Sequence, residues 1–361
     1  MLYHVFYPLK IFLSAFNIFS YITFRALCAM ATALFLSFVI GPSIISYLKK
    51  LQYVQIIRSD GPQTHLAKSG TPTMGGILIL ISVIVSTLLW ARLDNRFILW
   101  IIFGVLWLGM LGFIDDYLKI ARKNPKGLNK TWKLIGQSLF ALGVCLYLFY
   151  FPSNREFSTK INIPYLKEVY INLGWFYMIF AMLVIVASSN AVNLTDGLDG
   201  LAIGSLVLAA FTYSIFAYVC GHAKISNYLK VIPVAGAGEL TVFLAAVIGA
   251  GLGFLWFNGF PAEVFMGDTG ALFLGGAIGL VSVFIKQELI LIVVGGVFVI
   301  EVVSVILQVY SYRRYKKRIF RMAPLHHHFE LKGWAEPKVT LRFWIIGIIL
   351  TLLAIASLKI R

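Results

Sequence analysis

Residues 109–119, GMLGFIDDYLK, place two adjacent carboxylates at the end of a long apolar run. Asp115 and Asp116 repel each other, and each loses hydration near hydrocarbon, so acids at this position are expected to have a compensating partner. If the helix continues through the pair, Asp115 and Lys119 lie on one face, because residues four apart are neighbours. The motif therefore predicts either a solvated helix end with an ion pair or a functional site at a membrane boundary.

The apolar run belongs to a chain of 361 residues that is 60% hydrophobic and 13% charged, against roughly 25% charged in soluble domains. Runs of about 18 apolar residues, the length that crosses a bilayer as a helix, recur along the chain. We therefore expect one all-α, polytopic membrane domain over residues 1–361. About ten transmembrane helices are expected, at 24–47, 75–91, 97–114, 134–151, 174–192, 199–219, 240–258, 269–285, 288–310 and 340–358.

Two features of the apolar sequence are expected to be structural. Residues 1–22 are amphipathic and aromatic, and they lack the small-residue cleavage site of a signal peptide, so an interfacial segment is expected. The cysteines lie singly in apolar runs without metal-type spacing, which favours packing roles for Cys28, Cys145 and Cys220.

The net charge of +16 predicts the orientation in the membrane. Lys and Arg concentrate in cytoplasmic loops, and they are most frequent after the first, third and ninth expected helices, above all in the large basic loop 311–339. These loops share one side, so that side is expected to be cytoplasmic and both termini periplasmic. The basic surface could equally attract anionic lipids or a phosphorylated substrate.

Four polar motifs fall on this same expected side, which favours one shared cytoplasmic site. They are DDYLK, NAVNLTDGLDG (190–200), NGFPAEVFMGD (258–268) and PLHHHFE (324–330). In the second motif, polar side chains recur every third residue and would form one ridge on a tight helical turn: Asn190, Asn193, Asp196 and Asp199. Gly197 and Gly200 permit a close backbone approach. A ligand site is favoured there over a hydrated polar connector.

The other two motifs leave alternatives open. Asp268 could cap a helix or bind Mg²⁺ as a hard oxygen ligand, and Phe265 could stack on a planar ring or simply pack. Three consecutive histidines cannot easily converge on one zinc ion, so a phosphate contact, a helix-stabilising role or a solvated surface remains open for them. Glu301, deep in the ninth expected helix, is either functional or bound to a partner such as Ser304 or a neighbouring helix.

A magnesium ion would reconcile an acid-rich site with a phosphate-rich ligand, because it offsets the negative charge of both. A remaining carboxylate could then orient or deprotonate the attacking group. Nearby cations such as Lys68 and Lys119 would hold phosphates in place. These residues together indicate phosphoryl chemistry at a membrane surface.

The motifs together resemble the phospho-N-acetylmuramoyl-pentapeptide-transferases, the MraY family of the polyprenyl-phosphate N-acetylhexosamine-1-phosphate transferase superfamily. The resemblance covers nearly the whole chain and is carried by TPTMGG, DDYLK, NAVNLTDGLDGLA, GFLWFN, VFMGDTG and MAPLHHHFELKGW. It implies a ten-span, usually dimeric enzyme of the bacterial inner membrane with a cytoplasmic, Mg²⁺-dependent site. Such enzymes transfer phospho-MurNAc-pentapeptide from UDP-MurNAc-pentapeptide to undecaprenyl phosphate. The products are UMP and lipid I, in the first membrane step of peptidoglycan synthesis.

The resemblance also implies roles for individual residues. Asp268 becomes the leading Mg²⁺ ligand with Asn193 as a helper, and Asp115 becomes the candidate base beside Asp116. The three histidines join the catalytic group and would contact the diphosphate or sugar region: His326, His327 and His328. The implied substrate-binding residues are Lys68, Thr73, Lys119, Asn190, Asn193, Asp196, Asp199, Asn258 and Phe265. Direct attack by the lipid phosphate is favoured over a covalent aspartyl intermediate, which stays open.

Two rival functions have distinguishing features. A transporter or flippase usually has its site near the bilayer midplane and repeated halves, whereas these motifs crowd to one side and no convincing repeat is present. A sister transferase that uses UDP-GlcNAc is disfavoured by resemblance alone, through the block 324–334. Membrane lipids, and no nucleic acid, are the other expected partners.

Overall fold

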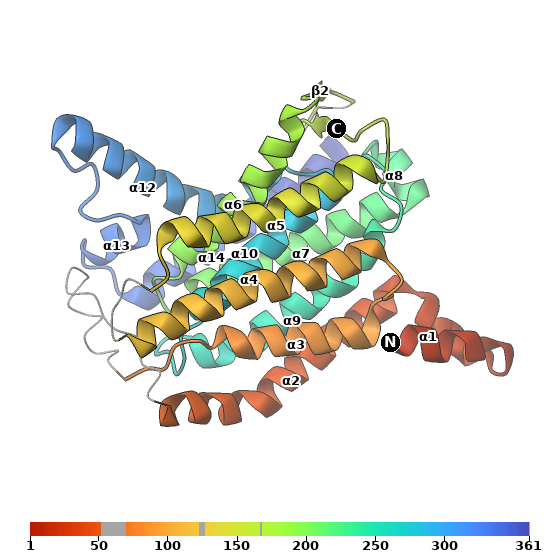
Figure 1. The fold of residues 1–361 in the computed structure, drawn as a ribbon, viewed down its shortest axis with the longest axis horizontal. Helices are drawn as coiled ribbons and strands as arrows, with labels where there is room; N and C mark the ends of the chain where they lie inside the picture. The colour runs from red at the N-terminus through yellow and green to blue at the C-terminus, as the bar shows by residue number, and fades with distance from the viewer. Residues whose placement is uncertain (52–69, 123–126, 167, 361) are drawn as a thin grey trace.

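The computed structural model describes residues 1–51, 70–122, 127–166 and 168–360. Within these ranges, nine helices have the length and apolar composition to cross a membrane, and α3 (Gly76–Trp90) is a shorter apolar helix. The nine are α2 (Ile22–Lys50), α4 (Arg96–Ala121), α5 (Lys130–Tyr150), α6 (Phe176–Thr195), α7 (Leu201–Gly221), α9 (Leu240–Asn258), α10 (Gly267–Phe284), α12 (Gly296–Tyr315) and α14 (Glu336–Ile360). They form one bundle (Figure 1), which confirms a helical, polytopic membrane protein with about ten spans.

The remaining elements are short. They are α1 (Leu2–Phe6), η1 (Tyr7–Ile11), η2 (Ser14–Ser20), β1 (Lys160–Asn162), β2 (Tyr170–Asn172), α8 (Ala223–Leu229), η4 (Ala237–Glu239), α11 (Leu291–Val294) and α13 (Leu325–Glu330). The first three are separate helical turns within residues 1–22, the segment expected to be interfacial. Strands β1 and β2 form an antiparallel pair, with Ile161 opposite Ile171, that the sequence pattern did not indicate.

Helix α10 is the centre of the bundle, and every residue from Thr269 to Phe284 is buried. It packs against α3, α4, α6 and α7. Small residues make these close contacts possible, as in other membrane helices: a Cβ on Gly112 of α4 would overlap the Asp268 carbonyl oxygen, and one on Gly76 of α3 would overlap the backbone of Gly270. The start of α10 is therefore held at the end of α4.

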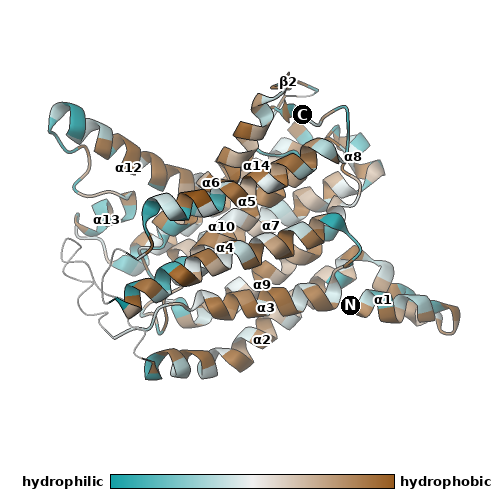
Figure 2. Ribbon diagram, in the orientation of Figure 1, coloured by the Kyte–Doolittle hydropathy of each residue, from teal (hydrophilic) through white to brown (hydrophobic). Residues whose placement is uncertain are grey.

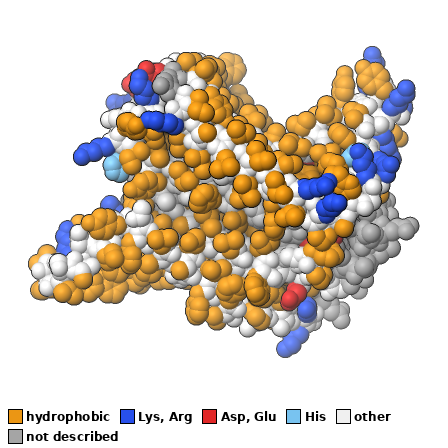
Figure 3. Space-filling model, turned by 180° about the vertical axis from the view of Figure 1, so that it is seen from behind, with side chains coloured by type: hydrophobic (Ala, Val, Ile, Leu, Met, Phe, Trp, Pro, Cys, Tyr) orange, Lys and Arg blue, Asp and Glu red, His pale blue; other side chains and the backbone are white. Residues whose placement is uncertain are grey.

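The outer surface of the bundle has the character of a lipid-facing surface. Hydrophobic residues follow the helices along their length, while polar residues gather at the helix ends (Figure 2). Seen from behind, apolar side chains cover most of the sides of the molecule, and Lys and Arg cluster at its extremities (Figure 3). Polar groups at the ends of apolar helices are what a bilayer requires.

The ninth expected helix differs from the prediction of one continuous span over 288–310. The segment is interrupted at Gly295, between α11 and α12, and α12 then runs on to Tyr315. Its far end projects from the bundle (Figure 1), so the first residues of the expected loop 311–339 are helical. Apolar periodicity did not reveal the break, because Gly295 and Gly296 lie inside an unbroken apolar run.

Both termini lie toward the end of the bundle opposite α13 (Figure 1). The Met1 amino group contacts the Leu88 carbonyl, and Lys359 Nζ donates to the Tyr228 hydroxyl at 2.6 Å. A buried pair, Arg25 and Glu239, joins α2 to the start of α9 there through two contacts of 2.6 Å. Termini on one side agree with an even number of spans, and their periplasmic location stays a prediction.

Candidate active site

Three carboxylates meet where α4 ends and α10 begins. Asp115, Asp116 and Asp268 each offer an oxygen within 4.8 Å of the others. Asp115 and Asp116 are buried in the last turns of α4, and Asp268 is the second residue of α10. The two sequence motifs DDYLK and VFMGD, about 150 residues apart, therefore form one cluster.

Asp116 binds the first turn of α10. Its Oδ1 accepts the backbone N–H of Asp268 at 3.2 Å, and its Oδ2 accepts the backbone N–H and the hydroxyl of Thr269 at 2.9 and 2.8 Å. The first N–H groups of a helix have no partner within the helix, so Asp116 caps α10 from a neighbouring helix. The cap interpretation of Asp268 is wrong, because the Asp268 carboxylate binds other side chains.

Two lysines compensate the three acids. Lys119 Nζ lies 2.8 Å from Asp115 Oδ2, 3.4 Å from Asp116 Oδ1 and 3.0 Å from Asp268 Oδ2. Lys133 Nζ lies 2.7 Å from Asp268 Oδ2 and 3.6 Å from Asp115 Oδ2. The compensating partners expected for Asp115 and Asp116 are therefore two ammonium groups and the N-terminal turn of α10.

Lys133 was missed from the sequence. It lies in the first turn of α5, where KTWK offers Lys130 and Lys133 as equal candidates. Only the three-dimensional structure distinguishes them, because Lys130 is exposed and Lys133 points to the acids. Lys68, expected to bind phosphate, lies outside the described residues.

The expected ridge of amides and acids divides into separate roles. Asn193 donates through Nδ2 to Asp268 Oδ1 at 2.7 Å. Asn190, one turn earlier, instead donates to Gln137 Oε1 at 2.8 Å and to the Val186 carbonyl. Asn190 therefore links α6 to α5 and does not reach the acid cluster.

Asp199 and Asn258 hold two loops together. Asp199 Oδ2 accepts the N–H of Ala262 at 3.0 Å, and Asn258 Oδ1 accepts the N–H of Gly200 at 3.1 Å. Asn258 also donates to the Val264 carbonyl at 2.8 Å. Both side chains are buried, so their observed contacts connect loop 196–200 to loop 259–266.

Asp196 interacts with the acid cluster and with the backbone of Gly267. Burial, followed by the negative charges of Asp268 and Asp116, raises the pKa of Asp196 to about 7, against the opposing hydrogen bond from the Gly267 N–H. The Asp196 carboxyl therefore interacts electrostatically with the acid cluster.

TPTMGG and VFMGD pair through their backbones. The Gly75 N–H donates to the Phe265 carbonyl, and the Phe265 N–H donates to the Pro72 carbonyl, each at 2.8 Å. Thr73 is buried beside Gly267, whose φ of 72° favours glycine. A Cβ at Gly267 would lie 3.0 Å from Thr73 Oγ1 and 2.7 Å from Asp116 Oδ2. This turn brings Thr73 and the half-buried Phe265 to the edge of the cluster.

The three histidines of α13 have three different environments. His326 is buried, with Nδ1 3.3 Å from Glu301 Oε1. His327 Nδ1 lies 2.7 Å from Glu330 Oε2, and His328 Nδ1 accepts the N–H of Arg321 at 3.0 Å. Burial and the charges of Lys332 and Arg321 lower the pKa of His328. The rings share no common point, so the described structure has no zinc-like arrangement there.

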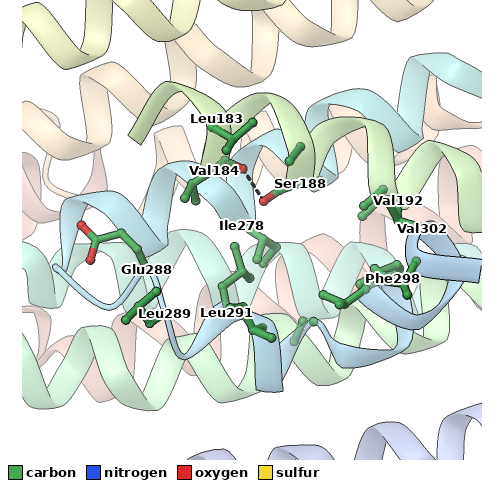
Figure 4. Close-up of a pocket in the computed structure, with 18 of the residues that line it drawn as sticks. Leu183, Val184, Ser188, Val192, Ile278, Glu288, Leu289, Leu291, Phe298 and Val302 are labelled. Carbon is green, nitrogen blue, oxygen red and sulfur yellow. Dashed lines mark hydrogen bonds between the residues drawn. The ribbon is translucent and has the colours of Figure 1, made fainter. Parts of the chain in front are cut away.

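An apolar cavity of about 270 Å³ opens between α6, α10 and α12. Figure 4 shows Val184, Ser188 and Val192 of α6 facing Ile278, Leu291 and Phe298, while the Glu288 carboxylate points away at one end. Ser188 donates to the Val184 carbonyl, so its hydroxyl is satisfied within α6. The other end reaches Ala191 and Val192, which directly precede Asn193 of the site.

Comparison with known proteins identifies the family. Residues 98–286 match glycosyl transferase family 4, and residues 68–80 match phospho-N-acetylmuramoyl-pentapeptide-transferase signature 1. Proteins named phospho-N-acetylmuramoyl-pentapeptide-transferase from Endomicrobium trichonymphae, Citrifermentans bemidjiense and Thermodesulfovibrio yellowstonii are 59%, 56% and 54% identical, each over 100% of both chains. The chain is a member of the phospho-N-acetylmuramoyl-pentapeptide-transferase family. Membership confirms the resemblance and makes the chain a multi-pass transferase of the bacterial cytoplasmic membrane, in place of the transporter alternative.

Asp115, Asp116 and Asp268 form a cluster of carboxylates that could hold a metal ion. Mg²⁺ prefers carboxylate and other hard oxygens and leaves room for substrate phosphates. Three converging carboxylates supply such oxygens, and Asn193, whose Nδ2 donates to Asp268, is the neighbouring amide. The residues present therefore fit a divalent hard cation.

Proposed function

We propose that this chain transfers phospho-MurNAc-pentapeptide from UDP-MurNAc-pentapeptide to undecaprenyl phosphate, with Mg²⁺ at the acid cluster, and releases UMP and lipid I. One observation carries the proposal: a cluster of acids and lysines lies where α4 ends and α10 begins, and an apolar cavity reaches Val192, the residue before Asn193. Family membership supplies the substrate class. A polar reaction centre beside an apolar cavity suits a lipid phosphate that meets a water-soluble nucleotide.

The cation would be held by Asp268, and Asn193 would help through its Oδ1 once the amide, whose Nδ2 now donates to Asp268, turns. When bound, the cation would offset the negative charge of the diphosphate. Lys119 and Lys133 now form ion pairs with the carboxylates. They are the groups that would turn to phosphate oxygens, because ammonium groups stabilise charge that grows on a leaving phosphate. The acids alone would repel both substrates.

Asp115 is the proposed base. Its Oδ1 accepts the Leu128 N–H at 2.6 Å, which leaves Oδ2 facing the centre of the cluster. It would take the proton from the lipid phosphate, whose oxygen attacks the sugar-linked phosphorus while the bond to the UMP oxygen breaks. Asp116 has both oxygens bound to the start of α10, so it is a poor nucleophile. This arrangement favours direct attack over a covalent intermediate.

The apolar cavity is the proposed entry for the acceptor. Its lining is almost entirely hydrocarbon, and one end adjoins the turn that carries Asn193. A prenyl chain gains from leaving water for such a surface. At this volume only part of the chain would be enclosed, and the remainder would lie in the bilayer. The phosphate would then sit at the acids.

The donor is proposed to bind on the side of Asp196 and Phe265, with the histidine segment covering its diphosphate. Asp199 and Asn258 would act by fixing the loops that carry these groups. A homodimer with cytoplasmic active sites and an interfacial segment 1–22 remains the expectation from the sequence. The strongly exposed Ile11 and Phe12 are compatible with contact to lipid or a second copy.

UMP release by the purified protein tests the function. Release is expected to require UDP-MurNAc-pentapeptide, undecaprenyl phosphate and Mg²⁺, and Asp268→Asn is expected to lower it by about 10²- to 10³-fold. Asp94→Asn is a matched control, because this exposed acid at the opposite end is paired only with surface groups. Equal use of UDP-GlcNAc would favour the sister transferase. No release by folded protein with every substrate present would reject the proposal.

A further inference from the structure

Glu301 is a completely buried acid in α12 that the proposed chemistry does not use. Its Oε2 accepts the backbone N–H of Leu325 at 2.6 Å, and its Oε1 accepts that of His326 at 3.2 Å. The same Oε1 lies 3.3 Å from His326 Nδ1. A carboxylate is costly to bury unless such partners satisfy it, and these partners are the first residues of the histidine segment α13.

The ring of His326 fills the space between Glu301 and the Asp196 loop. A Cβ placed on Gly197 would overlap His326 Nε2, so the ring and the loop backbone are in direct contact. On its other side, the ring centroid lies 4.2 Å from that of His327. A displacement of His326 therefore moves both its histidine neighbour and the backbone next to Asp196.

We propose that Glu301 is a positioning residue of the transferase, which acts through His326 to set the places of His327 and the Asp196 loop relative to the acid cluster. Glu301 has no exposed surface and does not touch substrate. The inference rests on the proposed function, because the groups it positions are those assigned to the donor side. It explains why an acid occurs deep in the apolar part of α12.

The direct test is Glu301→Gln, measured by steady-state kinetics with each substrate varied. Glutamine keeps the size, but its Nε2 cannot accept the N–H bonds that one carboxylate oxygen now accepts. The kcat/KM for the UDP-linked donor is expected to fall about 10- to 100-fold, because displacements near 1 Å have effects of this size. The KM for undecaprenyl phosphate is expected to change by less than about twofold, because the groups that Glu301 positions are those assigned to the donor and not to the lipid.

Gly197→Ala is an independent variant that reaches the same ring from the opposite side. It is expected to give the same pattern of donor kinetics without altering either member of the Glu301–His326 pair. Because both changes displace one ring, the double variant is expected to lose less than the product of the two single losses. A full multiplicative loss would contradict action through His326.

Glu239→Gln is the matched control. It makes the same substitution at a buried glutamate, in the Arg25 pair at the opposite end of the bundle. If Glu301→Gln and Glu239→Gln lower the Tm equally and also lower the donor kcat/KM equally, then Glu301 contributes only to general stability. That result would overturn the inference. So would a folded Glu301→Gln protein with donor kcat/KM within about twofold of the wild type. Inactive wild-type protein would instead contradict the proposed function.

Discussion

Asp116 and Asp268 are joined by a hydrogen bond from the Asp268 backbone N–H to Asp116 Oδ1, 3.2 Å long, while their carboxylates face the same cluster. One acid thus fixes the backbone of the other. The N–H groups in the first turn of α10 have no partner within the helix and form the positive end of the helix dipole. They point to Asp116. Like charges can therefore stand close together here without a bound cation.

This arrangement separates two roles that adjacent acids in a sequence do not distinguish. Both oxygens of Asp116 bind the start of α10, and its contact with Lys119 is the longest of the three, whereas Asp115 and Asp268 lie 3.0 Å or less from a lysine. A preorganised site of this kind needs little rearrangement when a phosphate and a cation enter, because its backbone is already fixed.

Asp116→Asn is expected to lower both stability and activity. The amide Nδ2 cannot accept the Thr269 N–H and hydroxyl, and a buried donor left without an acceptor costs about 1–3 kcal/mol. Thermal unfolding in detergent should show a lower Tm, and UMP release should fall with it. Thr269→Ala removes only the hydroxyl bond and keeps both backbone N–H bonds, so it should lose clearly less. Equal Tm values for Asp116→Asn and the wild type would refute the capping role.

Lys133→Gln is expected to separate catalysis from metal affinity. The change removes an ammonium group 2.7 Å from Asp268, so UMP release should fall on the order of 10²-fold. The apparent affinity for Mg²⁺ should rise, because the carboxylate loses a competing cation. A Mg²⁺ titration of activity measures both effects. Lys130→Gln, three residues earlier and exposed, should resemble the wild type, and weaker Mg²⁺ binding by Lys133→Gln would contradict this account.

The sequence predicted the helices well because hydrocarbon length is a strong signal. It did not locate the interruption at Gly295 or the short hairpin β1–β2. A break inside an apolar run leaves mean hydropathy unchanged, and a three-residue strand is set by its partner across space. The sequence predicts which end of the bundle faces the cytoplasm only from the distribution of Lys and Arg among the loops.

The sequence predicted that the polar motifs share one site, but it did not resolve the individual contacts of their residues. Asn190 and Asn193 look equivalent at three-residue spacing, yet they point to Gln137 and Asp268 respectively. Asp199 is likewise occupied with a loop N–H. Such differences depend on which neighbouring helix faces each side chain, and spacing within one segment carries no information on that.

Gly112→Ala is expected to destabilise the bundle and reduce activity together. The new Cβ would overlap the Asp268 carbonyl oxygen, and neither backbone can yield without separating α4 from α10. Overpacking of this kind typically costs about 1–3 kcal/mol. Gly143→Ala in α5 is the control, because its Cβ would meet nothing within 4 Å, and alanine favours the helix by up to about 1 kcal/mol. A Tm for Gly112→Ala as high as that for Gly143→Ala would contradict direct contact of the two helices.

Asp196→Asn is expected to stabilise the metal-free protein above neutral pH. The pKa of Asp196 is raised from 3.8 to about 7, so the folded state binds the proton more tightly than the unfolded state. Stability from this group is therefore lost as pH rises from about 4 to 7, and the loss is complete above that range. The Tm difference between Asp196→Asn and the wild type in EDTA should grow over this window and then level off.

Two comparisons make the origin of this pH dependence testable. Mg²⁺ should reduce the growth of the Tm difference, because a cation at Asp268 and Asp116 offsets the charges that help to raise the pKa of Asp196. Asp94→Asn should show no stabilisation, since the hydrogen bond from Arg92 lowers the pKa of Asp94. A Tm difference for Asp196→Asn that stays constant from pH 4 to pH 8 would show that this carboxyl is not perturbed by the cluster.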